Sequence, residues 1–159
     1  MTPAGVQIRR AESAGDLAAV AALFEAYAQS LGVDLGYQDF AAEVADLPGK
    51  YGPPGGELLI AAGPAGDVLG CVALRPERGG DAEMKRLYVA PAGRRMGLGR
   101  ALVEAIVSRA RSIGYCGIKL DTLPTMAEAL ALYRQTGFGP TPRYYDTPVE
   151  GTVFLRRAL

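Results

Sequence analysis

A strand, a loop rich in glycine and arginine, and an amphipathic helix follow one another over residues 82–113. The strand runs from Ala82 to Val89, and the loop after it contains Gly97 and Gly99. The apolar residues of the helix recur at helical spacing on one face; they are Leu98, Leu102, Val103, Ile106, Ala110 and Ile113. An apolar strand that passes directly into such a helix predicts a sheet with the helix packed against it.

The loop has the properties of an anion site. Its glycines let the backbone approach a ligand, and the first helical turn carries unpaired N–H groups and a partial positive charge. Three arginines add full charges: Arg94, Arg95 and Arg100. A pyrophosphate fits this loop, whereas the plain alternative is an ordinary strand-to-helix turn with solvated arginines.

Two other phosphate motifs fit the loop less well. A dinucleotide fingerprint would use Asp121 as its ribose contact, but Leu102 occupies the position of its third glycine. The Gly-Lys-Ser/Thr ending of a P-loop does not occur here either. The glycines alone therefore leave the ligand open.

Periodicity and turn residues predict the remaining elements. Ser13 and Asp16 resemble a capping box at the start of a long helix. In chain order we expect a strand at Val6–Arg10, that helix to Leu31, a weaker helix at Tyr37–Asp46, a loop over 47–56, a hairpin of Glu57–Ala62 and Val68–Leu74, a strand at Gly117–Thr122, a helix at Met126–Thr136, a break at 137–139 and a last strand at 152–159.

Composition narrows the class of protein. Seventeen basic residues balance seventeen acidic ones, so the basic surplus of a nucleic-acid binder is missing. No apolar run is long enough to span a bilayer, and the first residues lack the layout of a signal peptide. We therefore expect a cytoplasmic protein that binds neither nucleic acid nor membrane.

The chain contains no histidine and two cysteines, Cys71 and Cys116. The missing histidine removes the usual general base, the Ser-His and Cys-His nucleophile arrangements and the commonest metal ligand. Both cysteines lie in apolar strand-like stretches, where free buried thiols are commoner than a disulfide or a nucleophile. We expect no metal site.

Two separate motifs together resemble the GNAT superfamily of N-acetyltransferases. The first is Leu87-Tyr88-Val89-Ala90-Pro91 followed by Arg94-x-x-Gly97-x-Gly99-x-x-Leu102, and the second is Ala129-Leu130-Ala131-Leu132-Tyr133 followed by Gly137-Phe138. The tail 142–151 resembles a bacterial subgroup whose acceptor is unassigned.

The resemblance implies a mixed α/β fold in one acyl-CoA N-acyltransferase domain over residues 1–159. Its central sheet would have about six to seven mostly antiparallel strands, a splayed parallel pair, and about four flanking helices. The implied reaction is direct attack of an amine on acetyl-CoA through a tetrahedral intermediate. The alternatives are a non-catalytic acyl-CoA sensor and an enzyme that acts on a protein amine. Related proteins often pair, which makes a homodimer an option.

The resemblance also implies roles for individual residues. Backbone groups around Leu87 and Val89 would bind the pantetheine arm, and the loop would bind the pyrophosphate through Arg94, Arg95, Met96, Gly97, Leu98, Gly99 and Arg100. Tyr133 would be the general acid for the leaving thiolate, although its spacing also fits a core tyrosine. Met126 replaces an asparagine found in many relatives, so Thr122 is our candidate for the missing polar contact.

The base and the acceptor are less constrained. Glu83 is the candidate base, but strand rise places it about 13 Å along from Leu87, so it needs a bulge or a water relay. The alternative is a solvated glutamate, or one that is ion-paired with the neighbouring Lys85 or Arg86. Tyr27, Tyr144 and Tyr145 are candidate acceptor contacts, or else packed aromatics, and Arg143 is expected to be solvated. A small primary amine, such as an amino acid or related metabolite, is the preferred acceptor.

Overall fold

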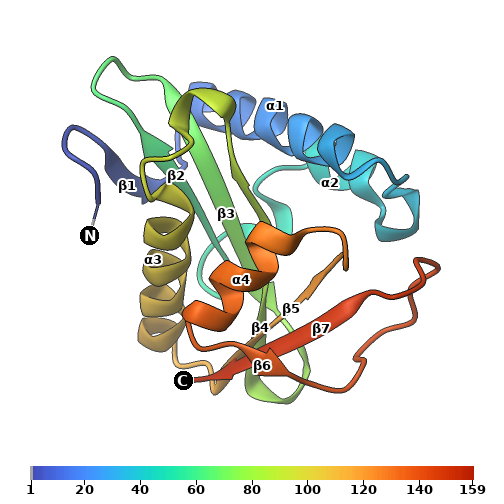
Figure 1. Cartoon of the computed structure of the whole chain (residues 1–159). Coiled ribbons are helices and arrows are strands. Elements are labelled where there is room, and N and C mark those ends of the chain that lie inside the picture. Colours follow the sequence, from blue (N-terminus) through green and yellow to red (C-terminus); the bar gives the residue numbers. More distant parts are fainter. Residues whose placement is uncertain (1) are drawn as a thin grey trace.

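The computed structural model describes residues 2–159 and contains one seven-stranded mixed sheet with helices on both faces (Figure 1). The strand order is β1-β2-β3-β4-β5-β7-β6, and only β4 and β5 pair in parallel. The strands are β1 Gln7–Arg10, β2 Glu57–Ala62, β3 Val68–Pro76, β4 Asp81–Val89, β5 Gly117–Thr122, β6 Gly139–Pro140 and β7 Val153–Ala158. The helices are α1 Ala14–Leu31, α2 Phe40–Ala45, α3 Leu98–Ile113 and α4 Ala127–Gln135. The predicted fold class is confirmed.

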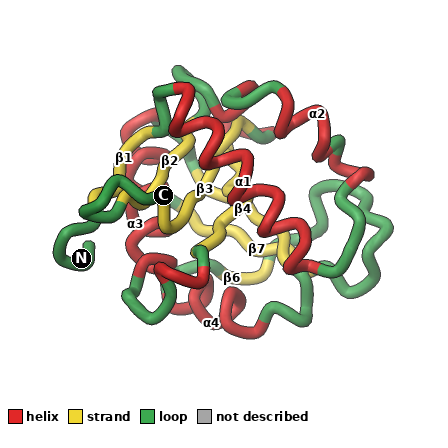
Figure 2. Tube along the Cα trace, turned by 90° about the horizontal axis from the view of Figure 1, so that it is seen from above, coloured by secondary structure: helices red, strands yellow, loops and turns green. Residues whose placement is uncertain are grey.

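Two hydrophobic clusters hold the layers together. The first joins α3 and α4 to one face of the sheet, with Leu102, Ile106 and Ile118 fully buried. The second joins α1 and α2 to the other face, around Phe24 and Ile60. Figure 2 shows the strands lying between α2 and α4. Strands β2 and β3 are nearly continuous apolar runs because both of their faces are covered.

Strand β4 contains one extra residue relative to β3. Ala73 pairs with Lys85, but Cys71 pairs with Tyr88, so three steps on β4 match two steps on β3. Arg86 has a φ of 61° at this point, and its carbonyl accepts a hydrogen bond from the Cys71 thiol. A bulge of this kind redirects the side chains that follow it. Both Lys85 and Arg86 consequently reach residues of the α1–α2 side of the sheet.

Three sequence-based details differ from the structure. The predicted helix Tyr37–Asp46 is divided into a 3-10 helix and α2, because Asp39 between them has a φ of 54°. The break at 137–139 leads into the two-residue strand β6. Cys71 is buried as predicted, but Cys116 is exposed, since it lies in the turn before β5 rather than within the strand.

The capping box at the start of α1 is confirmed. Ser13 Oγ accepts a hydrogen bond from the Asp16 N–H at 3.0 Å, and the Asp16 carboxylate accepts from the Ser13 N–H at 3.2 Å. Ser13→Ala removes the first bond, and we expect it to lower the free energy of unfolding by about 1 kcal/mol in a urea titration. Ser112→Ala, inside α3, is the matched control; an equal loss in both variants would contradict the role of the cap.

Candidate active site

The parallel strands β4 and β5 separate beyond a short paired region. Their register covers only residues 81–83 of β4 and 117–119 of β5. Beyond it, a narrow pocket with a cavity volume of about 30 Å³, partly open to solvent, lies between the two strands. Its walls come from both sides of the sheet and include Tyr27, Gln38, Lys85, Leu120, Asp121 and Tyr133. We call this hollow the central pocket. Figure 1 shows the two strands that border it, with α4 on one side of the sheet.

A second hollow continues from the central pocket toward the start of α3. It is lined by the end of β4, by Arg94 and Gly99, and by the first turn of α4. Both hollows share Tyr27, Leu87 and Met126, so they meet at these residues. We call the second hollow the outer groove. It gives an extended ligand a route from the glycine-arginine loop to Tyr133.

The loop before α3 exposes unpaired backbone donors. The first α-helical hydrogen bond runs from the Ala101 N–H to the Gly97 carbonyl, which leaves Leu98, Gly99 and Arg100 ahead of it. No side chain caps this end. Successive backbone N–H groups in αR-αL or turn conformations make anion-binding concavities, and in this loop Arg95 and Gly97 have left-handed φ values of 65° and 74°. The backbone here is suited to an anion such as a pyrophosphate.

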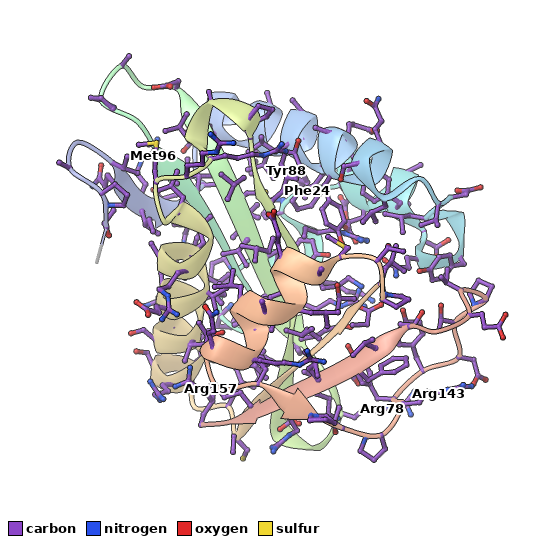
Figure 3. The ribbon with its side chains drawn as sticks, viewed as in Figure 1. Phe24, Arg78, Tyr88, Met96, Arg143 and Arg157 are labelled. Carbon is purple, nitrogen blue, oxygen red and sulfur yellow. The ribbon has the colours of Figure 1, made fainter. Side chains whose placement is uncertain are left out.

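The side chains of the same loop take different directions. Arg94 lines the outer groove, where its guanidinium lies over the Tyr88 ring and donates to the Val89 carbonyl at 3.1 Å. Arg100 turns toward Glu104 on α3 and Gln135 at the end of α4. Met96 is exposed at the outer end of the loop, as Figure 3 shows. Of these three side chains, only that of Arg94 lines the groove.

Tyr133 lines the central pocket from α4. Its ring packs edge-on against Phe138, and the residue is 7% exposed. Burial raises the pKa of Tyr133 above its ordinary value of 10, so the hydroxyl stays protonated at neutral pH. Tyr133 therefore packs in the core and also lines the pocket, so its interpretation as a core residue is compatible with its interpretation as a site residue.

Glu83 lies beneath the central pocket rather than in its wall. Its carboxylate accepts hydrogen bonds from Arg75 Nε at 2.8 Å and from the Tyr144 hydroxyl at 2.6 Å. The Lys85 ammonium is 3.9 Å from Glu83 Oε2. Glu83 is 1% exposed and is absent from the residues that line either hollow. The bulge occurs after Glu83, so it redirects Arg86 rather than this carboxylate.

Lys85, Asp121 and Gln38 form a polar network that the sequence analysis did not select. Lys85 Nζ donates to Gln38 Oε1 at 3.3 Å and lies 3.9 Å from Asp121 Oδ1. The hydroxyl of Tyr145 donates to Asp121 Oδ2. Burial lowers the pKa of Lys85, while the two nearby carboxylates oppose that change. The sequence signal that could have indicated this network is the presence of charged residues, Glu83, Lys85 and Asp121, within otherwise largely apolar strands.

The three predicted acceptor contacts are divided between two locations. Tyr27 lines both hollows, with the Arg86 guanidinium 6.0 Å from its ring centre, and burial raises its pKa to about 12. Tyr144 and Tyr145 lie on the segment between β6 and β7 and pack against Phe154. The Tyr144 hydroxyl donates a hydrogen bond to Glu83, and the Tyr145 hydroxyl donates one to Asp121.

Arg143, on the same segment, is exposed and pairs with Asp146, as the solvated alternative predicted (Figure 3). The positions proposed for the missing asparagine contact also lie together. Thr122 Oγ1 is 3.6 Å from the sulfur of Met126, and both residues line the central pocket. Cys71 is unsuited to nucleophilic attack, since burial raises the pKa of its thiol to about 12.

The fold and the pocket between splayed parallel strands define an acyltransferase of the GNAT type. The model of the acetyltransferase (GNAT) family matches residues 17–138, and this chain belongs to that family. Members of the family generally use acetyl-CoA. Two predictions are thereby confirmed: membership of the superfamily and acyltransferase activity.

Individual relatives support the same assignment. An uncharacterized N-acetyltransferase of the fission yeast Schizosaccharomyces pombe is 40% identical over 98% of this chain and 96% of its own length. An aminoglycoside N(6')-acetyltransferase of Klebsiella aerogenes is 34% identical, covering 64% of this chain and 71% of its own. The crystal structure of an acetyltransferase from Streptococcus agalactiae superposes with a TM-score of 0.80 over 98% and 99% of the two chains at 24% identity, which supports the fold. With a yeast protein among them, the bacterial subgroup stays a prediction.

Two properties of residues 2–159 bear on partners. Their helices include none with the length and apolarity that crossing a membrane requires. Their His, Cys, Asp and Glu side chains form no cluster able to hold a metal ion.

Proposed function

We propose that residues 1–159 form one domain that transfers the acetyl group of acetyl-CoA to a primary amine of a small molecule. The observation that carries this proposal is the continuous path from the glycine-arginine loop, through the outer groove, to the central pocket. The unpaired N–H groups before α3 would bind the pyrophosphate, and the groove would hold the pantetheine arm alongside Leu87 and Val89.

In this proposal the amine attacks the thioester carbonyl directly, through a tetrahedral intermediate. Tyr133, protonated and at the inner end of the path, donates its proton to the thiolate that leaves. The aminoglycoside acetyltransferase among the relatives is consistent with a small-molecule acceptor. The central pocket is narrow and lies between α1, α4 and the chain before α2, which favours a small amine over a protein chain.

The structure changes the role that we propose for Glu83. Both of its oxygens already have partners, and it lies outside the pocket wall. We propose that it positions Arg75, Lys85 and Tyr144, and that any proton it takes from the acceptor must pass through one of its neighbours or a water. Among the described residues that line the central pocket, Asp121 supplies the one carboxylate.

The proposed function is tested by calorimetric titration of acetyl-CoA into the protein, followed by measurement of thiol release with a panel of small amines. We expect binding, and release that depends on the amine. Binding with no release from any amine would favour the alternative of an acyl-CoA sensor. Release only with a protein amine would favour that other alternative, and no binding would overturn the proposal. Cytoplasmic location and a possible homodimer remain expectations.

A further inference from the structure

Lys85 and Asp121 place opposite charges side by side in the wall of the central pocket. Lys85 comes from the bulged part of β4 and Asp121 from the end of β5, and the two line the pocket with Gln38. Their charged atoms are 3.9 Å apart. This is about 1 Å longer than a close charge-assisted hydrogen bond. The two groups are near neighbours without forming a direct hydrogen bond to each other.

The other charges around the pocket are matched in close pairs. Arg75 holds Glu83 at 2.8 Å, and Arg86 holds Glu43 at 2.8 Å. Arg86 donates two hydrogen bonds to the Glu43 carboxylate, and Arg75 contacts Glu83 Oε1 through two of its nitrogens. Lys85 and Asp121 are therefore the charges of the wall that a ligand can engage without breaking a close ion pair.

We propose that the acceptor is a zwitterion, an amine that carries a carboxylate beside its amino group, with its ammonium facing Asp121 and its carboxylate facing Lys85. This proposal rests on the proposed function and names the substrate class of the same pocket. Lys85 is then the residue that determines specificity for the carboxylate, and Asp121 is the residue that holds the amine.

Charge conservation in a buried site favours this acceptor over a simple amine. Lys85 and Asp121 together are neutral, and a zwitterion adds no net charge when it lies between them. A simple ammonium that pairs with Asp121 would leave the Lys85 ammonium, whose side chain is 4% exposed, with Glu83 Oε2 at 3.9 Å, an oxygen that already accepts a hydrogen bond from Tyr144. Incomplete pairing of a buried charge is unfavourable. A carboxylate beside Lys85 also opposes the effect of burial, which lowers the pKa of that residue.

The surrounding residues hold both charges in place. Gln38 accepts a hydrogen bond from Lys85 Nζ and donates one to the Tyr145 hydroxyl at 3.4 Å. The Tyr145 hydroxyl in turn donates to Asp121. The network thus connects Lys85 to Asp121 through two uncharged side chains, so the positions of the two charges do not depend on a direct bond between them.

The experiment compares three ligands of matched shape: an α-amino acid, its carboxamide, and the amine that lacks the carboxylate. Each is titrated calorimetrically into the protein saturated with coenzyme A, so that binding is measured without turnover. We expect the amino acid that binds best to bind at least about tenfold more tightly than its two partners. Equal or weaker binding of every amino acid tested, relative to its partners, would overturn the proposal.

Variants assign the preference to Lys85. Lys85→Met is expected to reduce amino-acid binding to the level of the carboxamide. Lys85→Arg keeps a positive charge and is expected to retain a preference for the amino acid. Lys50→Met removes an exposed lysine from the surface and should leave the preference intact. Circular dichroism checks that each variant is folded. A folded Lys85→Met protein that keeps the wild-type preference would overturn the assignment.

The binding measurement separates this inference from the proposed function. Thiol release with simple amines or carboxamides, together with no tighter binding of the amino acid than of these two ligands, would support acetyl transfer and overturn the zwitterion. Selective amino-acid binding that Lys85→Met abolishes, without thiol release, would support the zwitterion site and count against catalysis.

Discussion

Gly97→Trp is expected to weaken the binding of coenzyme A at least about a hundredfold, equivalent to about 2.7 kcal/mol. Gly97 precedes α3 with a φ of 74°, and a Cβ at this position would meet no protein atom within 4 Å. The space beside the unpaired N–H groups of the first turn is therefore open. An indole placed there fills the volume that the pyrophosphate needs. Calorimetric titration of coenzyme A into the folded variant measures the loss.

A matched control separates the steric effect from backbone strain. Gly66, in the turn between β2 and β3, has a φ of 84° and equally open surroundings. A side chain at positive φ costs roughly 1–2 kcal/mol at either position. Gly66→Trp should therefore lose similar stability but keep its affinity for coenzyme A. Unchanged affinity in folded Gly97→Trp would remove the loop from the cofactor site.

Tyr133→Phe is expected to lower turnover by at least about tenfold while the affinity for coenzyme A changes little. The ring of Tyr133 packs on Phe138, and phenylalanine preserves that packing. Only the hydroxyl is lost, from a residue that lines the pocket. The substitution therefore removes a proton donor from the pocket at small structural cost.

The kinetic measurement is thiol release at saturating acetyl-CoA, combined with calorimetry for the cofactor. Tyr115→Phe is a suitable control, because that hydroxyl donates to the Gly55 carbonyl and neither residue lines the central pocket or the outer groove. It should affect stability but leave turnover unchanged. Wild-type turnover in Tyr133→Phe would assign Tyr133 to the core alone.

Local patterns in the sequence were sufficient to predict most of the fold. The capping box at Ser13 and the apolar face of α3 each depend on residues a few positions apart. Such features are set by backbone geometry and burial, which leave a direct periodic trace in the sequence. The division of the second helix at Asp39 was missed because a non-glycine residue at positive φ has no reliable local signal.

The candidate site was only partly predictable, because only some of its contacts join residues that are close in the sequence. The loop from Arg94 to Arg100 is contiguous, so its anion-binding character could be inferred from the sequence. The partners of Glu83 could not, since Arg75 and Tyr144 come from β3 and from the segment before β7. The ion-paired alternative named Lys85 and Arg86, its neighbours in sequence. Lys85 does lie 3.9 Å from Glu83, but the closer partners are Arg75 and Tyr144.

The sequence by itself determined the order of strands and helices, the glycine-arginine loop and the absence of histidine chemistry, because each is a property of neighbouring residues or of composition. The tertiary structure alone decided that β4 and β5 diverge after three paired residues and that a bulge brings Lys85 and Arg86 to the same face. It also placed Lys85 beside Asp121, 36 positions away, by the register of two parallel strands (121 − 85 = 36). Contacts of this range depend on strand pairing and on a single inserted residue, which local propensity does not encode.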